Sequence, residues 1–292
     1  MEKKCAGQES PLFAKSFQEP PEFSSDLIRG LRRKIRGYYD VYRRNFPWRE
    51  TDNPYNILVS EVMLQQTQTS RVESKYLQFL EAFPDVAALD AAELTSVLRI
   101  WKGLGYNRRA LVLKRIAQIV LRDFDGELPR SLDALLGLPG IGRATAGAIL
   151  AFAFNEPVVF IETNIRRVFL HFFFPDREAV SDQEILPIIE QTLDRDDPRH
   201  WYYALMDYGA MLAKDGPNPN RRSAHYTRQA RFTGSNRQIR GQILQLLLER
   251  SGLQDKELVE HLGVEAERVR KILDALVQEG FLKRKKGKLF LR

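Results

Sequence analysis

The sequence predicts a mainly helical protein, in which a larger helical domain is followed by a small domain that ends in a β-hairpin. Apolar residues recur at helical spacing in most segments between residues 26 and 213, and strand-like alternation is nearly absent. Charge and proline content change after Ala213. A second run of amphipathic segments begins near Ser235 and ends in two short stretches around a basic glycine turn.

The composition allows a large core and favours a polyanionic partner. Of the 292 residues, 43% are hydrophobic, and 45 Lys and Arg against 38 Asp and Glu give a formal net charge of +7. Because Cys5 is the one cysteine, the chain can form neither an intrachain disulfide nor a cysteine-rich metal or iron–sulfur site. The sequence shows no secretory signal and no apolar run of the ~20 residues that a membrane span needs. We therefore expect a cytoplasmic protein that does not contact membranes. We also expect it to be a monomer.

Residues 1–25 are polar and aperiodic, and we expect them to form a loose arm. Residues 26–213 form the larger domain, whose first helix should be capped by Ser25 or Asp26. Its further helices are expected over NPYNILVSEVMLQQT, SRVESKYLQFLEAF, DAAELTSVLRIW, NRRALVLKRIAQIVLRDF, SLDALLG, RATAGAILAFAF, ETNIRRVFLHFF and WYYALMDYGAMLA.

Residues 214–234 are interpreted as a basic linker, which is either a DNA-contacting segment or a solvated tether. Residues 235–292 follow the order helix, helix, turn at Gly263, helix and hairpin, which resembles a winged helix. The segment 280–292 has six Lys and Arg and no acid. It would suit DNA or another polyanion; the alternative is a small protein-interaction module.

The segment LLGLPGIGRATAGAIL, residues 135–150, predicts a phosphate-binding turn between two helices. Pro139 should end the first helix, and Gly140 and Gly142 permit positive φ and leave backbone N–H groups uncovered. A turn of this kind can bind one DNA phosphate without reading sequence. It could instead be an ordinary helix–helix turn, and whether it holds a monovalent cation stays open. The expected phosphate contacts are Leu138, Gly140, Gly142, Arg143, Ala144 and Thr145.

This turn, together with SEVMLQQTQ, WKGLGYNRRA and YYALMDYGAML, resembles the helix-hairpin-helix DNA glycosylase superfamily over residues 28–213. The resemblance is to its endonuclease III-like members and, among these, to MutY-type adenine glycosylases. It implies a two-lobed helical fold and, as partner, double-stranded DNA that contains a mispaired or damaged base.

The resemblance assigns chemistry to two carboxylates. Glu61 matches the acid that protonates adenine, and its apolar neighbours should raise its pKa. In FIETNIRRV, Glu162 stands where the family has an aspartate that stabilises the sugar cation; its alternative role is that of an acid at a helix N-terminus. Ala144 stands where related lyases have a Schiff-base lysine, which implies a monofunctional, water-using enzyme.

The resemblance also assigns residues that flip and hold the base. Gln65, Gln66 and Tyr106 would enter the duplex. Trp48, Arg49, Leu64 and Asp207 would line the base pocket, with core packing as the alternative for Trp48 and Leu64. Further candidate phosphate contacts are Lys102, Arg108, Arg109, Arg143 and Arg166.

The sequence departs from the family in two places. The four cysteines that hold a [4Fe–4S] cluster in most relatives fall on Ala213, Asn220, Ser223 and Gln229, so no cluster and no other cofactor is expected. Charge on Arg221, Arg222, Arg228 and Arg231 could replace the DNA contact of the cluster loop. A winged-helix-like domain also stands in place of the domain that recognises 8-oxoguanine.

The function expected is therefore excision of adenine mispaired with 8-oxoguanine or guanine, in base excision repair. A mismatch-specific thymine/uracil glycosylase on the same scaffold is one alternative. A non-catalytic DNA-binding protein is the other.

Overall fold

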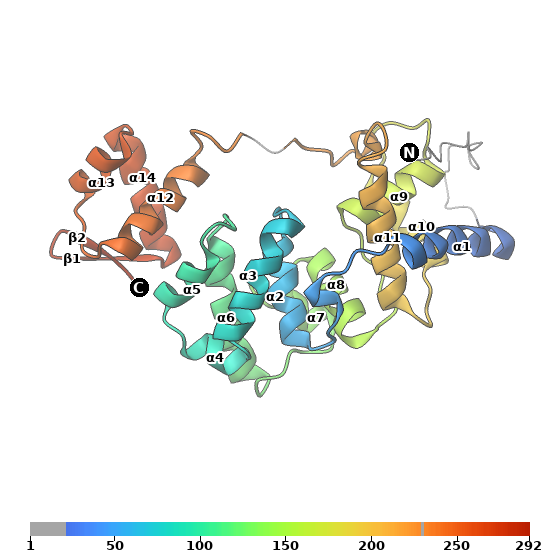
Figure 1. Ribbon diagram of the computed structural model, residues 1–292, viewed down its shortest axis with the longest axis horizontal. Helices are drawn as coiled ribbons and strands as arrows, with labels where there is room; N and C mark the ends of the chain where they lie inside the picture. Colours follow the sequence, from blue (N-terminus) through green and yellow to red (C-terminus); the bar gives the residue numbers. More distant parts are fainter. Residues whose placement is uncertain (1–21, 229–230) are drawn as a thin grey trace. The chain divides into compact units, whose positions relative to one another are not determined.

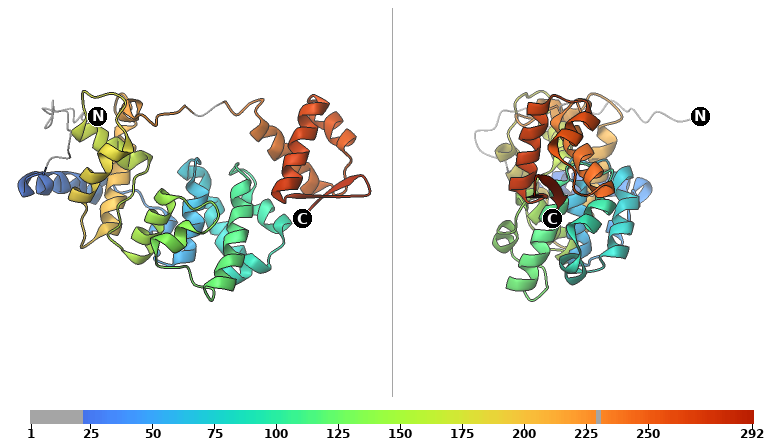
Figure 2. Two further views of the ribbon diagram at one scale, coloured as in Figure 1. Left: turned by 180° about the vertical axis from the view of Figure 1, so that it is seen from behind. Right: turned by 90° about the vertical axis from the view of Figure 1, so that its left-hand side faces the viewer.

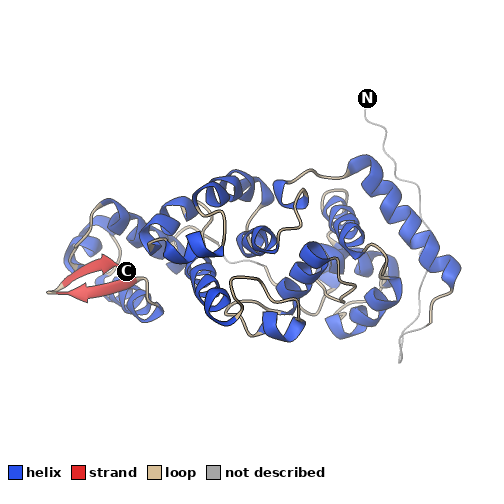
Figure 3. Cartoon of the chain, turned by 90° about the horizontal axis from the view of Figure 1, so that it is seen from below, coloured by secondary structure: helices blue, strands red, loops and turns tan. Residues whose placement is uncertain are grey.

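The computed structural model describes residues 22–228 and 231–292, so most of the predicted N-terminal arm lies outside the described residues. Figure 3 shows that the described part is helical apart from one two-stranded hairpin. The chain divides into two compact units, residues 1–45 with 150–228 and residues 46–149 with 229–292. Within the described ranges, no helix has both the length and the apolar character needed to cross a membrane.

The first unit is built around packed helices that are far apart in sequence (Figure 1). The helix α11 (Pro198–Leu212) contacts both α9 (Thr163–Phe173) and α1 (Ser25–Tyr42). Its core contains large buried side chains, among them Trp201 and Phe169. The N-cap of α1 is Ser24, whose hydroxyl accepts from the Leu27 N–H at 3.4 Å, so the predicted cap was one or two residues too late.

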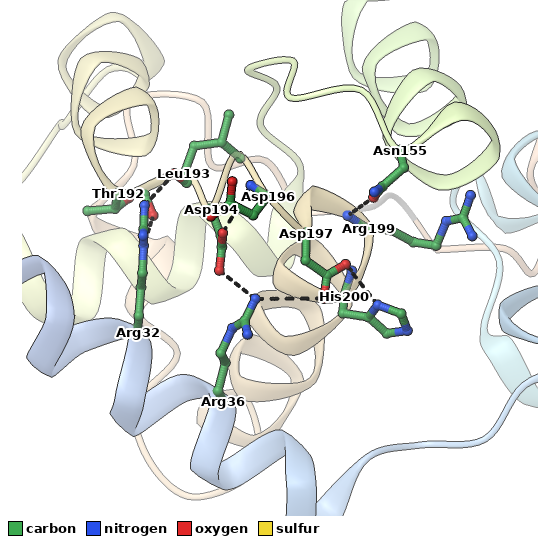
Figure 4. A network of polar contacts seen from close by, with 10 residues as sticks. All are labelled: Arg32, Arg36, Asn155, Thr192, Leu193, Asp194, Asp196, Asp197, Arg199 and His200. Atoms are coloured by element: carbon green, nitrogen blue, oxygen red, sulfur yellow. Dashed lines mark hydrogen bonds and ion pairs between the residues drawn. The ribbon is translucent and has the colours of Figure 1, made fainter.

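Two arginines of α1 attach this helix to the turn before α11 (Figure 4). The Arg32 guanidinium donates to the carbonyl oxygens of Thr192, at 3.1 Å, and Leu193. Arg36 forms an ion pair with Asp194 at 2.5 Å. These contacts tie the start of the unit to its C-terminal half, across about 160 residues of sequence.

The helix α10 (Asp182–Thr192) belongs to the first unit and was not predicted. It contains Pro187, which removes one intrahelical hydrogen bond. Its start is nonetheless stabilised by a capping box, in which the Glu184 carboxylate accepts from the Ser181 N–H at 3.0 Å. The internal proline concealed a helix that its capping box would have indicated.

The second unit contains most of the predicted helices. In α2, Asn53 is the N-cap and accepts from the N–H groups of Tyr55 and Asn56, while Pro54 occupies the first turn. Trp101 and Phe79 are fully buried in its core. Its elements up to the hairpin turn are η1 (Pro47–Arg49), α2 (Pro54–Leu64), α3 (Thr69–Ala82), α4 (Val86–Ala91), α5 (Leu94–Trp101), α6 (Arg108–Asp123) and α7 (Leu132–Leu136); α8 (Arg143–Phe154) begins in this unit and ends in the other.

The C-terminal part of the second unit has the predicted order of elements. The helices α12 (Asn236–Glu249), α13 (Asp255–Leu262) and α14 (Ala266–Glu279) precede the strands β1 (Leu282–Lys285) and β2 (Lys288–Leu291) (Figure 2). The two strands are antiparallel, and an isolated bridge joins Leu253 to Leu289. Gly263 ends α13 in the left-handed region with φ +60°, as the predicted turn requires.

Candidate active site

The glycine turn between α7 and α8 depends on Gly140 more than on Gly142. Gly140 has φ +73°, and a Cβ at this position would lie 2.8 Å from Cγ1 of Val112. Gly142 does not have positive φ, which corrects one expectation for this turn. The buried side chains of Leu138 and Ile141 anchor the turn in the core of its unit.

The N-terminus of α8 is presented to solvent. The first hydrogen bond within the helix runs from the Ala146 N–H to the Gly142 carbonyl at 2.8 Å, so the N–H groups before Ala146 have no intrahelical partner. Gly142, Arg143 and Ala144 are exposed. Such a helix start can accept an anionic group. The preceding helix ends at Leu136 with Gly137 as its C-cap, two residues earlier than Pro139 was expected to end it.

Gln65 links this turn to the end of α2. Gln65 is the C-cap of α2, and its side-chain amide donates to the Thr145 hydroxyl at 3.3 Å. Both residues were predicted site residues. The structure therefore brings the predicted flipping segment and the predicted phosphate-binding turn together within one unit.

Two of the three residues predicted to enter DNA have unusual backbone conformations. Gln66 has φ +53° and Tyr106 has φ +44°, in the left-handed region that residues other than glycine rarely adopt. Gln66 is exposed and Tyr106 is half-buried. Backbone strain of this kind is held in place by surrounding structure and is concentrated at functional sites.

Arg109 supplies that surrounding structure. This arginine is only 8% exposed, and its guanidinium donates to carbonyl oxygens of both loops. On the α2 side, the acceptors are Met63 and Gln65, both at 2.7 Å; on the other side they are Leu104 at 3.2 Å and Gly105 at 3.1 Å. Desolvation lowers the pKa of Arg109 to about 10. One buried cation thus joins the loop of Gln66 to the loop of Tyr106.

Arg109 had been expected to contact phosphate, and that prediction was wrong. The guanidinium is buried, and its N–H donors are used by carbonyl groups, so it is not available to a phosphate. Arg166 is likewise engaged, in a two-point ion pair with Asp182 at 2.6 and 2.7 Å. Lys102 and Arg108 are exposed and stay candidate phosphate contacts, although Nζ of Lys102 lies 4.0 Å from the Glu249 carboxylate.

Tyr106 also contacts the C-terminal part of its unit. The Arg237 guanidinium lies 5.0 Å from the centroid of the Tyr106 ring and donates to the phenolic oxygen. Sequence reasoning did not identify Arg237. The residue adjoins the predicted basic linker, and the many basic residues there do not indicate which of them contacts Tyr106.

The predicted acid Glu61 and the predicted pocket residue Leu64 lie on α2, and Gln65 follows them as its C-cap. Glu61 is half-buried and is followed by the buried residues Val62 and Met63; Leu64 is half-buried. Glu61 precedes Gln65 by four residues, so the two share one face of the helix end. Val62 and Met63, the next two residues of the helix, are buried, and the role of Glu61 as an acid stays a prediction.

Trp48 and Arg49 pack against Phe46. Trp48 is 4% exposed, with its ring stacked on that of Phe46 at 4.8 Å and edge-on to Tyr76 at 5.6 Å. The Arg49 guanidinium lies 5.3 Å from the Phe46 ring centroid. The side chain of Trp48 is therefore part of the core, which was the alternative, and a role for both residues in the base pocket stays a prediction.

The second predicted carboxylate, Glu162, belongs to the other unit and is the N-cap of α9. Its Oε1 accepts from the N–H groups of Asn164 at 2.7 Å and Ile165 at 2.8 Å. Burial raises the pKa of Glu162, while these hydrogen bonds and the charges of Arg167 and Arg166 offset part of that rise. The alternative role of Glu162, as the acid at a helix N-terminus, is thus confirmed. The Glu162 carboxyl at this position has a raised pKa.

The segment in the place of the family's cluster loop contacts α9 near both ends of that helix. The Asn220 amide donates to the Thr163 carbonyl at 2.9 Å, and Asn218 accepts from Arg167 at 3.0 Å. Arg222 donates to the Leu170 carbonyl at 2.9 Å. These residues form or adjoin the 3-10 helix η2 (Pro219–Arg222), so this part of the predicted linker is folded and Arg222 has a structural partner.

The cluster ligand positions do not fit iron and sulfur. Asn220 and Ser223 are buried with side chains that are not thiolates, Ala213 has no ligating atom, and Gln229 lies outside the described residues. Within the described residues there is no group of three or more His, Cys, Asp or Glu that could hold a metal ion.

Asp207, a predicted pocket residue, is buried at 2% exposure in the first unit. Its Oδ1 accepts from Nε of Arg44 at 2.6 Å, and its Oδ2 accepts from the Arg44 backbone N–H at 2.9 Å. Its charge contributes to a raised pKa of Tyr38, second to burial. Asp207 therefore has at least a structural role, which is to hold the chain just after α1.

The sequence matches a known family and several named relatives. Residues 59–190 match the HhH-GPD superfamily base excision DNA repair protein model. An adenine DNA glycosylase of Mycolicibacterium smegmatis is 36% identical over 231 residues, which cover 73% of this chain and 79% of the relative. An adenine DNA glycosylase of Buchnera aphidicola is 35% identical over 188 residues, but the match spans only 53% of that relative.

Solved structures show the same fold. A thermostable thymine-DNA glycosylase superposes with a TM-score of 0.59 at 25% identity, over 66% of this chain and 91% of that one. A non-covalent endonuclease III–DNA complex gives a TM-score of 0.58 at 20% identity, over 67% and 91% of the two chains. The second likeness concerns the fold alone.

Proposed function

Because this chain belongs to the HhH-GPD superfamily of base excision DNA repair proteins, we propose that it is a DNA glycosylase that hydrolyses the N-glycosidic bond of adenine opposite 8-oxoguanine or guanine. Double-stranded DNA is the proposed partner. The observation that carries the proposal is the pair of left-handed residues, Gln66 and Tyr106, on two loops that the buried Arg109 joins. Base flipping requires side chains that are held ready to enter the duplex.

Glu61 is the proposed general acid. Adenine leaves readily only when protonated, and a half-buried carboxyl one turn before Gln65 is suited to deliver that proton. Glu162 is the proposed stabiliser of the oxocarbenium-like sugar, since a carboxylate lowers the barrier to forming that cation. Asp207, Trp48, Arg49 and Leu64 are proposed to shape the base pocket.

The reaction is proposed to use water and no cofactor. Ala144, at the exposed start of α8, has no nucleophile. Borohydride treatment during the reaction should therefore trap no protein–DNA adduct. Protein purified without oxygen should contain no stoichiometric iron, since the chain has one cysteine. We propose a monomer in the cytoplasm.

The deciding experiment uses duplexes that carry a single A:8-oxoguanine, A:G, T:G or U:G pair, followed by alkali to reveal abasic sites. Cleavage at the adenine-containing pairs is expected. Glu61→Gln should abolish it while leaving duplex affinity unchanged, and Glu73→Gln, on the exposed surface of α3, is the matched control. Product from Glu61→Gln at the native rate would refute the role of Glu61.

A thymine or uracil glycosylase is the second candidate. It is favoured by the structural likeness to a thermostable thymine-DNA glycosylase, at 25% identity over 91% of that chain. Cleavage at T:G or U:G alone would establish it. Binding of all four duplexes without cleavage would instead indicate a non-catalytic DNA-binding protein.

A further inference from the structure

The β1–β2 hairpin has two chemically distinct faces. In its register, Lys283 pairs with Phe290 and Lys285 pairs with Lys288. Because side chains alternate along a strand, these residues share one face. The residues of the opposite face include Leu282, Leu289 and Leu291, which are buried. The lysines of the first face, and Lys286 in the turn, are all exposed.

The arrangement of these lysines is locally unfavourable in two ways. Lys285 and Lys288 lie directly opposite each other, and like charges in a cross-strand pair repel. The two-residue turn has φ +51° at Lys286 and φ +72° at Gly287, the pattern of a type I′ turn. Its first position favours Asn, Asp or Gly, so a lysine there adds charge at the expense of turn stability.

The neighbouring surfaces do not neutralise this charge. Arg284, on the opposite face, forms ion pairs with Asp255 at 2.6 Å and Asp274 at 3.1 Å. On α14, Lys271 pairs with Glu267 at 2.6 Å, so that helix presents charges of both signs. For Lys283, Lys285, Lys286 and Lys288, the part of the chain that the structure describes contains no carboxylate within ion-pair distance.

We propose that these four lysines, termed the wing lysines, are a second contact to the phosphate backbone of the DNA duplex, separate from the hairpin turn at α8. Unneutralised lysines on a projecting turn suit a polyanion, and lysine binds phosphate without reading base sequence. The mixed charge of α14 makes sequence-specific reading by that helix the weaker alternative. The inference rests on the proposed DNA partner, but its test requires no excision.

The test measures binding of the full chain to a fluorescein-labelled undamaged duplex at several KCl concentrations. Each phosphate contact contributes about −0.9 to the slope of log K against log salt. The triple variant K283Q/K285Q/K288Q should therefore reduce the magnitude of the slope by about 2 to 3. The control K256Q/R270Q/K271Q removes the same charge from the helices of the same domain and should leave the slope unchanged.

A single substitution separates binding from folding. Lys286→Asn removes one charge but introduces a residue that the type I′ turn favours. It should lower the slope by about 1 while the melting temperature stays the same or rises. Lower affinity accompanied by a lower melting temperature would mean that the hairpin has a structural role only, and would overturn the proposal.

Two other outcomes overturn it. One is an unchanged slope in the triple variant, or an equal fall in the control. The other is a triple variant that binds the DNA duplex as the native protein does but loses affinity for a single-stranded homopolymeric RNA. That result would identify RNA as the partner of the wing lysines. If the native protein excises a base but the triple variant has an unchanged salt slope, this inference alone is refuted. If the triple variant has a reduced slope but the native protein excises no base, the proposed function alone is refuted.

Discussion

At the scale of single residues, Arg109 differs most from what its sequence context suggests. An arginine in NRRA, next to a glycine loop, predicts a phosphate contact, yet this one is buried. The spacing of apolar residues along the helix could have corrected the prediction, because it places Arg109 on the buried face. Arg109 precedes Leu113, Ile116 and Val120 by four, seven and eleven residues, and all three are buried. Its hydrogen-bond partners are backbone carbonyl groups of two loops. Because every residue has such a group, the sequence does not indicate which ones accept from Arg109.

Replacing Arg109 should therefore damage stability as well as activity. Arg109→Met leaves several buried carbonyl groups without a donor, and we expect the free energy of unfolding to fall by about 3 kcal/mol. Urea unfolding would measure this loss, and the single-turnover excision rate should fall with it. Arg108→Met, at the exposed neighbouring position, is the control and should change unfolding by less than about 0.5 kcal/mol. Equal stability of the two variants would contradict the role assigned to Arg109.

The raised pKa of Glu162 predicts opposite effects on stability and catalysis. A carboxyl whose pKa is higher in the folded protein destabilises the fold when ionised, and this cost disappears as the pH falls below its ordinary pKa. Glu162→Gln retains an acceptor for the N–H groups of Asn164 and Ile165. It should therefore raise the melting temperature at neutral pH, with a difference that shrinks towards pH 4, while lowering the excision rate.

The native enzyme provides the complementary measurement. Its single-turnover rate should fall as the pH drops through the raised pKa of Glu162, because the protonated group no longer stabilises a cation. A variant Glu162→Gln that is less stable at neutral pH, or as active as the native protein, would contradict this assignment.

At the scale of elements, the pattern of apolar residues predicted most helices and the terminal hairpin. It failed where one local rule opposed another, as in α10, where Pro187 outweighed the capping box of Ser181 and Glu184. It also failed at the predicted linker, where basic and proline-rich composition concealed η2 and its contacts to α9. Composition reports the average of a segment, whereas Asn218 and Asn220 act as single hydrogen-bonding groups.

The backbones of α9 and α11 approach each other closely at Gly209. A Cβ at Gly209 would lie 2.2 Å from the Asn164 carbonyl oxygen. Gly209→Ala should therefore lower the free energy of unfolding by about 3 kcal/mol, through overpacking. Gly30→Ala, in α1 with no atom within 4 Å of the added carbon, should instead raise it by about 0.5–1 kcal/mol. Chemical denaturation of both variants tests the pair, and a neutral Gly209→Ala would show that the helices can separate.

At the scale of the whole molecule, neither compact unit is continuous in sequence. Composition predicted domains in linear order, but the first unit joins residues 1–45 to residues 150–228. Contacts between residues that far apart, such as the ion pair of Arg36 with Asp194, cannot be predicted from the spacing of residues in a single sequence. The apolar pattern predicted the helical fold class, whereas the expectation of two lobes came from the resemblance to a known family.

This discontinuity has a consequence for the order in which the protein is made. The buried side chains of α1, Leu31 and Ile35, pack in a unit whose other helices follow more than a hundred residues later. At a synthesis rate of about 5–20 residues per second, α1 leaves the ribosome roughly 10 to 30 s before α11 is complete. We expect residues 46–149, which are made in between and contain their own buried core, to fold during that interval. On ribosomes stalled before α11, α1 should therefore remain open to protease after the intervening helices have become resistant.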